Sequence, residues 1–194
     1  MIRPLSINER LHLVIPIYAD DGETITGYVH SAPISREVFE AHFMLISKTF
    51  SMIYSEGLAV LAGPRIASLV LRRAAEAMGN QAGGMALMNE IRRLSNVLLR
   101  SSNGWDAHQF QEAVDHQLLS EDDLTEVTNA IVYFIVASAM HPKRQLRIVM
   151  DGVTQAWGAQ TLSSNFTTFA ASLPTSSGAV STTPNPNLAS AVVF

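Results

Sequence analysis

The sequence predicts a mainly α protein: a helical bundle with an N-terminal β-hairpin and an uncharged, partly disordered C-terminal tail. Apolar residues recur every three or four positions through most of the chain after Pro33, a spacing typical of amphipathic helices. Before Pro33, two short apolar runs flank an Asp-Gly pair, which favours a hairpin. Residues 152–194 contain no Asp, Glu, Lys or Arg. These patterns divide the chain into a hairpin region at 1–34, a helical bundle at 35–158, and a short helix with a flexible uncharged tail at 159–194.

The hairpin is predicted from residues 11–17 and 24–29, two apolar, β-branched runs on either side of Asp20-Asp21-Gly22. Pro16 has no backbone N–H to donate, so it suits an edge position. A two-stranded hairpin alone is only marginally stable in water. We therefore expect the hairpin to pack on the helices or to pair with another segment.

Three amphipathic helices are expected next. Ser35 is a candidate N-cap for the first helix, and Pro64 suits the first residue of the second. The apolar stripe of the first helix is Phe39, Phe43, Ile46, Phe50 and Ile53. That of the second is Ile66, Leu69, Val70, Ala74 and Ala77. The third stripe is Leu87, Ile91, Leu94 and Leu98, and we expect this helix to end before Asn103-Gly104.

Two further helix starts are marked by capping residues. Asp106 and Gln109 have the spacing of a capping box ahead of a short helix. Ser120 is followed by three carboxylates at 121–123, which stabilise a helix start because the helix dipole is positive there. The second of these helices continues through the apolar run 131–140, shorter than the about 20 residues needed to span a membrane. We expect it to lie buried at the centre of the bundle.

The C-terminal region combines apolar anchors with an absence of charge. A further helical stripe is Leu146, Val149, Val153 and Trp157. A short helix is expected at 165–171, with Phe166 and Phe169 on one side, and Leu173-Pro174 should end it. Soluble surfaces normally carry interspersed charges. The uncharged segment must therefore be solvated by Ser and Thr, packed against its own domain, or covered by a partner.

Composition and charge exclude several classes of protein. Hydrophobic residues make up 47% and charged residues 15% of the chain, which excludes disorder throughout. The 13 basic and 17 acidic side chains give a net charge of −4, so binding of nucleic acid by bulk charge is not expected. The absence of cysteine excludes disulfides, thiolate metal sites and cysteine nucleophiles. An arginine-rich block at 58–104 precedes an acidic block at 105–130; these are solvated helix faces, or they pair within the chain or across an oligomer interface.

No motif predicts catalysis, a cofactor or a metal site. The glycines at 79–84 lack the lysine of a phosphate-binding loop, so we interpret them as a connection between helices. His108 and His116 are eight residues apart and could share a helix face with Glu112, although solvated helix residues are the simpler explanation of this pattern. The N-terminus shows no apolar segment typical of a secretory signal, so we expect a cytoplasmic protein that is neither an enzyme nor a membrane protein.

One stretch, residues 155–158 and 162–176, resembles the C-terminal part of tail assembly chaperones of long-tailed bacteriophages, centred on the string Phe-Ala-Ala-Ser-Leu-Pro-Thr-Ser. The resemblance covers about 22 of the 194 residues. It implies a small, mostly helical protein in the host cell cytoplasm without catalytic activity. Its implied partners are the tape measure protein, which it would keep soluble, and the tail tube subunits that polymerise around that protein.

Two sets of residues are candidates for partner contact. The first comprises the apolar side chains Trp157, Phe166, Phe169 and Leu173 of the uncharged region, because aromatic anchors dominate interfaces. They could instead dock on their own bundle. The second set, Met78, Met85 and Met88, surrounds Gly83-Gly84 and would either form an adaptable client groove or fill the core.

Three hypotheses about function follow from the sequence. The first is a phage tail assembly chaperone, which could also form a homo-oligomer. The second is a structural virion protein of the tail or connector, in which the hairpin edge and the C-terminal arm join neighbouring subunits by strand addition. The third is a small soluble enzyme or regulator whose site has no recognisable motif, and a deep pocket lined by His108, His116 and Glu112 would favour it.

Overall fold

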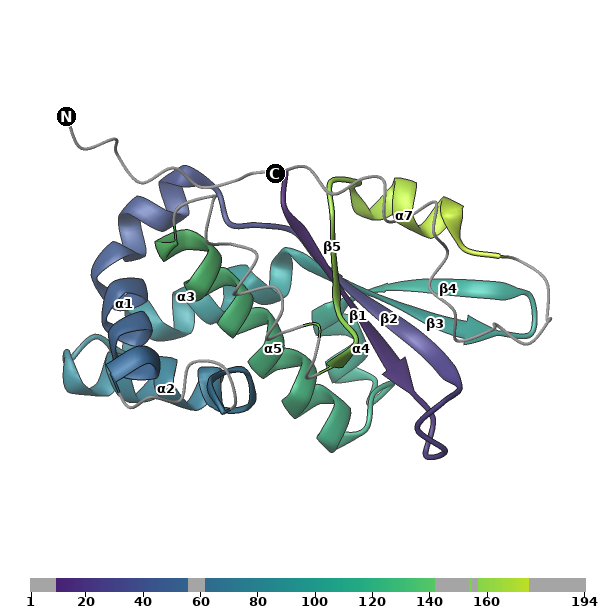
Figure 1. Ribbon diagram of the computed structural model, residues 1–194, viewed down its shortest axis with the longest axis horizontal. Coiled ribbons are helices and arrows are strands. Elements are labelled where there is room, and N and C mark those ends of the chain that lie inside the picture. The colour runs from purple at the N-terminus through teal and green to yellow at the C-terminus, as the bar shows by residue number, and fades with distance from the viewer. Residues whose placement is uncertain (1–9, 56–61, 142–153, 155–156, 175–194) are drawn as a thin grey trace.

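A computed structural model describes residues 10–55, 62–141, 154 and 157–174 (Figure 1). These residues form a mixed α/β fold of six helices and a five-stranded antiparallel sheet in the order β4-β3-β2-β1-β5. The strands are β1 His12–Tyr18, β2 Ile25–Ser31, β3 Ser95–Ser101, β4 Gly104–Gln109 and β5 Gln160–Leu162. The helices are α1 Arg36–Ser55, α2 Gly63–Ala77, α3 Gln81–Arg93, α4 Phe110–Asp115, α5 Glu121–Met140 and α7 Phe166–Ser172. Strands from all three regions of the chain pair in this one sheet.

The prediction of a mainly α protein is wrong at residues 95–109. The third helix does not extend to Asn103; it ends at Arg93, and the chain then forms the β3–β4 hairpin. Leu94 and Leu98 have helical spacing, but Leu98 pairs with Tyr28 of β2 and Ala107 of β4. A short apolar run satisfies both periodicities, and pairing with a distant strand decides between them.

The turn between β3 and β4 contains Asn103-Gly104, which had been predicted to follow the end of a helix. Ser101 pairs with Gly104, and Gly104 has φ of 128°, a value that L side chains rarely adopt. Asp106 therefore lies in β4 and is not a helix cap. The cap of α4 forms three residues later, where the Glu112 carboxylate accepts a hydrogen bond from the Gln109 N–H at 3.4 Å.

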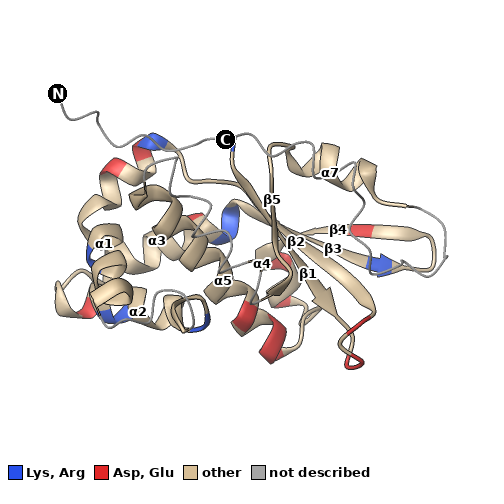
Figure 2. Ribbon diagram, in the orientation of Figure 1, with Lys and Arg blue, Asp and Glu red and all other residues tan. Residues whose placement is uncertain are grey.

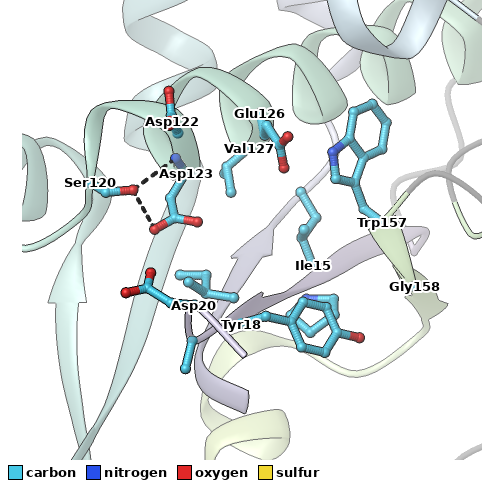
Figure 3. Close-up of a pocket in the computed structure, with 13 residues that line it drawn as sticks. Ile15, Tyr18, Asp20, Ser120, Asp122, Asp123, Glu126, Val127, Trp157 and Gly158 are labelled. Atoms are coloured by element: carbon cyan, nitrogen blue, oxygen red, sulfur yellow. Dashed lines mark hydrogen bonds between the residues drawn. The ribbon is translucent and has the colours of Figure 1, made fainter. Parts of the chain in front are cut away.

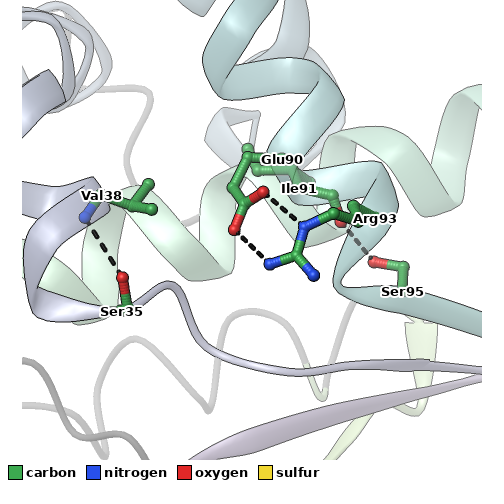
Figure 4. Close-up of polar contacts among 6 residues, drawn as sticks. All are labelled: Ser35, Val38, Glu90, Ile91, Arg93 and Ser95. Carbon is green, nitrogen blue, oxygen red and sulfur yellow. Dashed lines mark hydrogen bonds and ion pairs between the residues drawn. The ribbon is translucent and has the colours of Figure 1, made fainter.

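The boundary between α3 and β3 is held by local polar contacts (Figure 4). Near the C-terminus of α3, the Arg93 guanidinium donates two hydrogen bonds of 2.7 Å to the Glu90 carboxylate. The Ser95 hydroxyl donates to the Ile91 carbonyl at 2.9 Å, which satisfies an acceptor that the end of the helix leaves free. The chain thus leaves the helix at Leu94 and enters the sheet at once.

The N-terminal hairpin is confirmed, and the sheet extends it on both sides. β1 pairs with β2, β2 pairs with β3, and β5 pairs with residues 12–14 of β1. Pro16 lies beyond the residues that β5 covers, which agrees with the edge position expected for it. In the turn, the Asp21 carboxylate accepts hydrogen bonds from the Glu23 N–H, the Thr24 N–H and the Thr24 hydroxyl. These bonds hold the pKa of Asp21 below its usual value.

Helices cover one face of the sheet, with α5 at their centre, as predicted (Figure 1). Eleven residues of α5 are buried, and Ser120 caps its start by accepting from the Asp123 N–H at 3.1 Å. Ser35 likewise accepts from the Val38 N–H at 3.2 Å at the start of α1 (Figure 4). Within the described residues, we find no helix with the length and apolar character to span a membrane.

The other face of the sheet carries α7. The predicted short helix forms with Asn165 as its N-cap, whose side chain accepts from the Thr168 N–H at 2.9 Å. A second apolar cluster, separate from the main core, joins this helix to the sheet. The buried members of the cluster are Val14, Leu98, Leu162 and Phe169. The predicted stripe at 146–153 and the tail at 175–194 lie outside the described residues.

Candidate functional site

The structure locates the four predicted contact residues at two places. Phe166, Phe169 and Leu173 come together on the outer face of the sheet, where they pack in the second apolar cluster. Phe169 is buried there, with 4% of its surface exposed. Trp157 lies apart from them and packs against the main core. Of the two alternatives for these anchors, docking on the protein's own fold is the one that Phe169 adopts.

The segment from β5 to α7 is tied to the sheet by polar contacts as well. The His30 ring donates from Nε2 to the Ser164 carbonyl at 3.1 Å, and the Trp105 indole donates to the Pro174 carbonyl at 3.0 Å. The rings of Phe166 and Phe169 each lie 5.8 Å from the His30 ring, centroid to centroid. Burial lowers the pKa of His30, because the charged imidazolium would lose its hydration. Packing of α7 on the sheet therefore favours the neutral form of the His30 ring.

A first cavity, of about 600 Å³, lies where the second half of β1 faces the start of α5 and Trp157 (Figure 3). Its acidic lining residues are Asp20, Asp122, Asp123 and Glu126. Figure 2 shows that acidic residues gather at this end of the molecule, in the β1–β2 turn and at the start of α5. Of the four carboxylates, Asp123 accepts from the Ser120 hydroxyl at 2.6 Å. The cavity is accordingly negative, but no group of three or more His, Asp or Glu side chains within the described ranges is arranged to hold a metal ion.

A second cavity, of about 440 Å³ and mostly apolar, lies between α2 and α3; we call it the methionine groove. It is lined by Ser68, Leu71, Arg72, Ala75 and Glu76 of α2, by Gln81, Gly84, Met85, Met88 and Arg92 of α3, and by Thr128 of α5. Gly84 allows the two helices to approach closely, since a Cβ on it would lie 2.7 Å from the Ala75 Cβ. The groove thus depends on a small residue at the point where α3 crosses α2.

The predicted methionine cluster divides between the groove and the core. Met85 is 64% exposed and Met78 is 37% exposed, whereas Met88 is partly buried and packs against the main core. Met85 and Met88 both line the groove. A thioether side chain is flexible and polarizable, so it adapts to apolar surfaces of different shape. These methionines give the groove an adaptable apolar wall.

The groove also contains two arginines, Arg72 and Arg92, that were not predicted from the sequence to contribute to it. Both belong to Arg-Arg pairs, in which one arginine lines the groove and its neighbour does not. Helical periodicity contained a signal, because Arg92 follows Met85 and Met88 at seven and four residues on α3. Ser68 was missed too: its N–H and its hydroxyl both donate to the buried Asn129 side chain, which joins α2 to α5.

The histidine pair proposed as a metal site does not share a helix face. His108 lies in β4, and His116 is the C-cap of α4. His108 Nδ1 lies 3.9 Å from a carboxylate oxygen of Glu112. Neither of the two cavities is lined by these three residues. Arg36 pairs with Glu40 and Arg93 pairs with Glu90, in each case within one helix.

Comparison with known proteins identifies no relative. No protein-family model matches the chain, and neither a curated protein nor a solved structure is significantly similar to it. The resemblance of residues 155–176 to tail assembly chaperones is therefore a feature of the sequence alone, and the function that it implies is a proposal.

Proposed function

We propose that this protein is a tail assembly chaperone of a long-tailed bacteriophage. In this role it binds the tape measure protein in the host cell cytoplasm and keeps it soluble while tail tube subunits polymerise around it. The action is non-covalent and requires no catalytic residue, cofactor or metal. The C-terminal resemblance suggests the role, and the methionine groove supports it with a surface suited to an apolar client.

The observation that carries the proposal is Met85, which leaves 64% of its surface exposed beside the apolar lining of the groove. A holdase must contact apolar segments of differing sequence, and flexible thioethers suit such contacts. An exposed large apolar side chain also occurs at Leu69 of α2, so this helix offers further apolar surface. Helix α7 is a less suitable contact site for the client, because the Phe169 side chain is already buried on the sheet.

The alternative of a structural virion protein is supported by a different feature, the outer edge of β4. Within the described residues, β4 pairs with β3 alone, so its other edge can accept a strand from a neighbouring subunit. The N-terminal hairpin is less suited to strand addition. Strand β2 is paired on both edges, and β5 covers part of the edge of β1 that faces away from β2. Detection of the chain in purified particles by mass spectrometry would favour this alternative.

Co-expression with the tape measure protein of the same genome tests the chaperone proposal. We expect this chain to raise the soluble fraction of the tape measure protein and to co-purify with it. Met85→Gln should weaken both effects, because a buried methionine contributes about 1.5–3 kcal/mol that a polar amide does not. Met44→Gln is the matched control, since Met44 is 65% exposed and lies outside the groove. A tape measure protein that stays insoluble with the wild-type chain would contradict the proposal.

A further inference from the structure

Arg92 presents a buried donor without an acceptor. Its Nε atom is inaccessible to solvent, and within the described residues it has no hydrogen-bond partner. The next residue, Arg93, contrasts with it by making two hydrogen bonds to Glu90. A buried guanidinium N–H without an acceptor is unfavourable, because it has lost water and gained nothing in return. An acceptor from outside the chain cannot reach the buried Nε itself, but Arg92 as a residue is only partly buried and lines the methionine groove, so such an acceptor can contact the accessible part of its side chain there.

The surroundings of Arg92 indicate what kind of molecule supplies that acceptor. Leu71, Ala75 and Met88 line the same groove with apolar surface, and Arg72 adds a second positive charge from α2. Glu76 also lines the groove, but no ion pair between described residues joins it to either arginine. The occupant must therefore combine apolar side chains with a negative charge.

The elements around the groove favour a helical occupant. Every lining residue comes from α2, α3 or α5, so no strand edge is present to pair with an extended peptide. A helix that binds in such a groove contacts it with apolar residues spaced three and four positions apart. A residue that flanks this apolar stripe, one turn away, can reach the side chains at the edge of the groove. Arginine and carboxylate are geometrically matched, because the planar guanidinium donates two parallel hydrogen bonds.

We infer that the methionine groove binds an amphipathic helix of the partner that carries a carboxylate beside its apolar stripe, and that Arg92 accommodates this carboxylate. The inference rests on the proposed function for the presence of a client and specifies the chemistry of the client segment. Charge complementarity gives the interaction its selectivity, and the apolar lining contributes contact area. Neutral helices with the same stripe bind the groove more weakly, and helices with a lysine at the flanking position bind least.

Three synthetic peptides test the inference with the full-length chain. Each is an 18-residue helix with the same Leu, Ala and Met stripe and a neutral Gln and Ser polar face, and the two positions flanking the stripe carry Glu, Gln or Lys. Fluorescence anisotropy of labelled peptides should give about tenfold tighter binding of the Glu peptide than of the Gln peptide at low salt. The difference should shrink as the salt concentration rises, because ions screen the charges.

Arginine variants identify the residue responsible. Arg92→Gln should remove the preference for the Glu peptide over the Gln peptide. Arg73→Gln is the matched control, because Arg73 is exposed and lies outside the groove, and it should keep the preference. Circular dichroism establishes that both variants are folded. If Arg92→Gln does not fold, the affinities of the wild-type chain for the Glu, Gln and Lys peptides still test whether the groove prefers a carboxylate.

The outcomes separate this inference from the proposed function. Equal binding of the Glu and Gln peptides, or a preference that persists in Arg92→Gln, overturns the inference. If no peptide binds but the chain still solubilises the tape measure protein, the inference is also overturned and the chaperone function stands. If the Glu preference and its loss in Arg92→Gln are observed while the tape measure protein stays insoluble, the groove chemistry is upheld and the client is a different protein.

Discussion

At the scale of single residues, His30 lies at the junction between the sheet and α7. Its side chain is 1% exposed, and its ring centroid is 5.0 Å from that of His12 on the neighbouring strand. Burial lowers the pKa of His30, and burial together with the charge on His30 lowers the pKa of His12. Both rings are therefore neutral in the folded state at pH values where the unfolded chain already takes up protons.

The lowered pKa values predict a loss of stability in acid. Above pH of about 6.5 the histidines are neutral in both states and the full stability is present. As the pH falls below that value, the unfolded state binds protons first, so the free energy of unfolding decreases until the folded-state pKa values are reached. Each unit by which a histidine pKa is lowered corresponds to about 1.4 kcal/mol.

Urea unfolding at pH 7.5 and pH 5.5 measures this effect. The stability lost between the two pH values should be smaller in His30→Phe than in the wild-type chain, because one of the titrating groups is removed. An identical pH dependence in His30→Phe and wild type would show that His30 does not contribute.

At the scale of elements, the contact between α2 and α3 depends on the absence of a side chain at Gly84. A Cβ there would lie 2.7 Å from the Ala75 Cβ, closer than carbon atoms approach in folded proteins. The two helices would have to move apart, and the groove that they form would change width. Helix packing and groove geometry are thus set by the same residue.

Gly84→Ala should therefore destabilise the protein although alanine favours helices. Overpacking typically costs about 1–3 kcal/mol, against about 1 kcal/mol gained in helix propensity. Thermal and urea unfolding would measure the net loss. Combining it with Ala75→Gly removes the clash and should restore part of the stability. A double variant less stable than either single variant would contradict this account of the contact.

Several elements could be predicted from local sequence, whereas β3 and β4 could not. Ser120 and Asn165 cap α5 and α7 as expected, because a cap involves residues only three apart. Leu98 was assigned to a helix because its spacing from Leu94 fits one. Its actual environment depends on Tyr28, about 70 residues earlier in the chain, and sequence periodicity contains no information on such a partner.

At the scale of the whole molecule, the sheet separates a large core from a small one. The main core lies between the sheet and helices α1 to α5, and the second cluster lies under α7 on the opposite face. Phe169 is the aromatic side chain that is buried in the second cluster. The uncharged region from 159 to 174 is therefore, in part, the cover of an apolar sheet face, which explains how residues without charge can be accommodated.

Phe169→Ala tests this account of the C-terminal region. Truncating a buried phenylalanine typically costs about 3–5 kcal/mol, and we expect about 3 kcal/mol here because the second cluster is small. Binding of a dye specific for apolar surface should increase as the face under α7 opens. Thr167→Ala, at an exposed position of the same helix, should change stability by less than about 0.5 kcal/mol. A Phe169→Ala variant as stable as Thr167→Ala would mean that α7 is not docked in solution.

The candidate site was predictable in its apolar part only. Met78, Met85 and Met88 were recognised as a cluster around Gly83-Gly84, and the two alternatives considered divide between them, because Met85 is exposed whereas Met88 packs against the main core. The buried Nε of Arg92 was not predictable, because it depends on how α3 packs against α2. The anchors at Phe166 and Phe169 were recognised as apolar contacts, but no local pattern distinguishes a partner's surface from the protein's own sheet.

The amino-acid sequence by itself determined the turn at Asp21, the start of α5 at Ser120 and the helical form of α7, because caps, turns and amphipathic spacing act within a few residues. Only the tertiary structure decided that residues 95–109 form two strands and that Arg92 faces an apolar groove. Both of these outcomes depend on packing between segments far apart in the chain, and the free energy of that packing outweighs local preference.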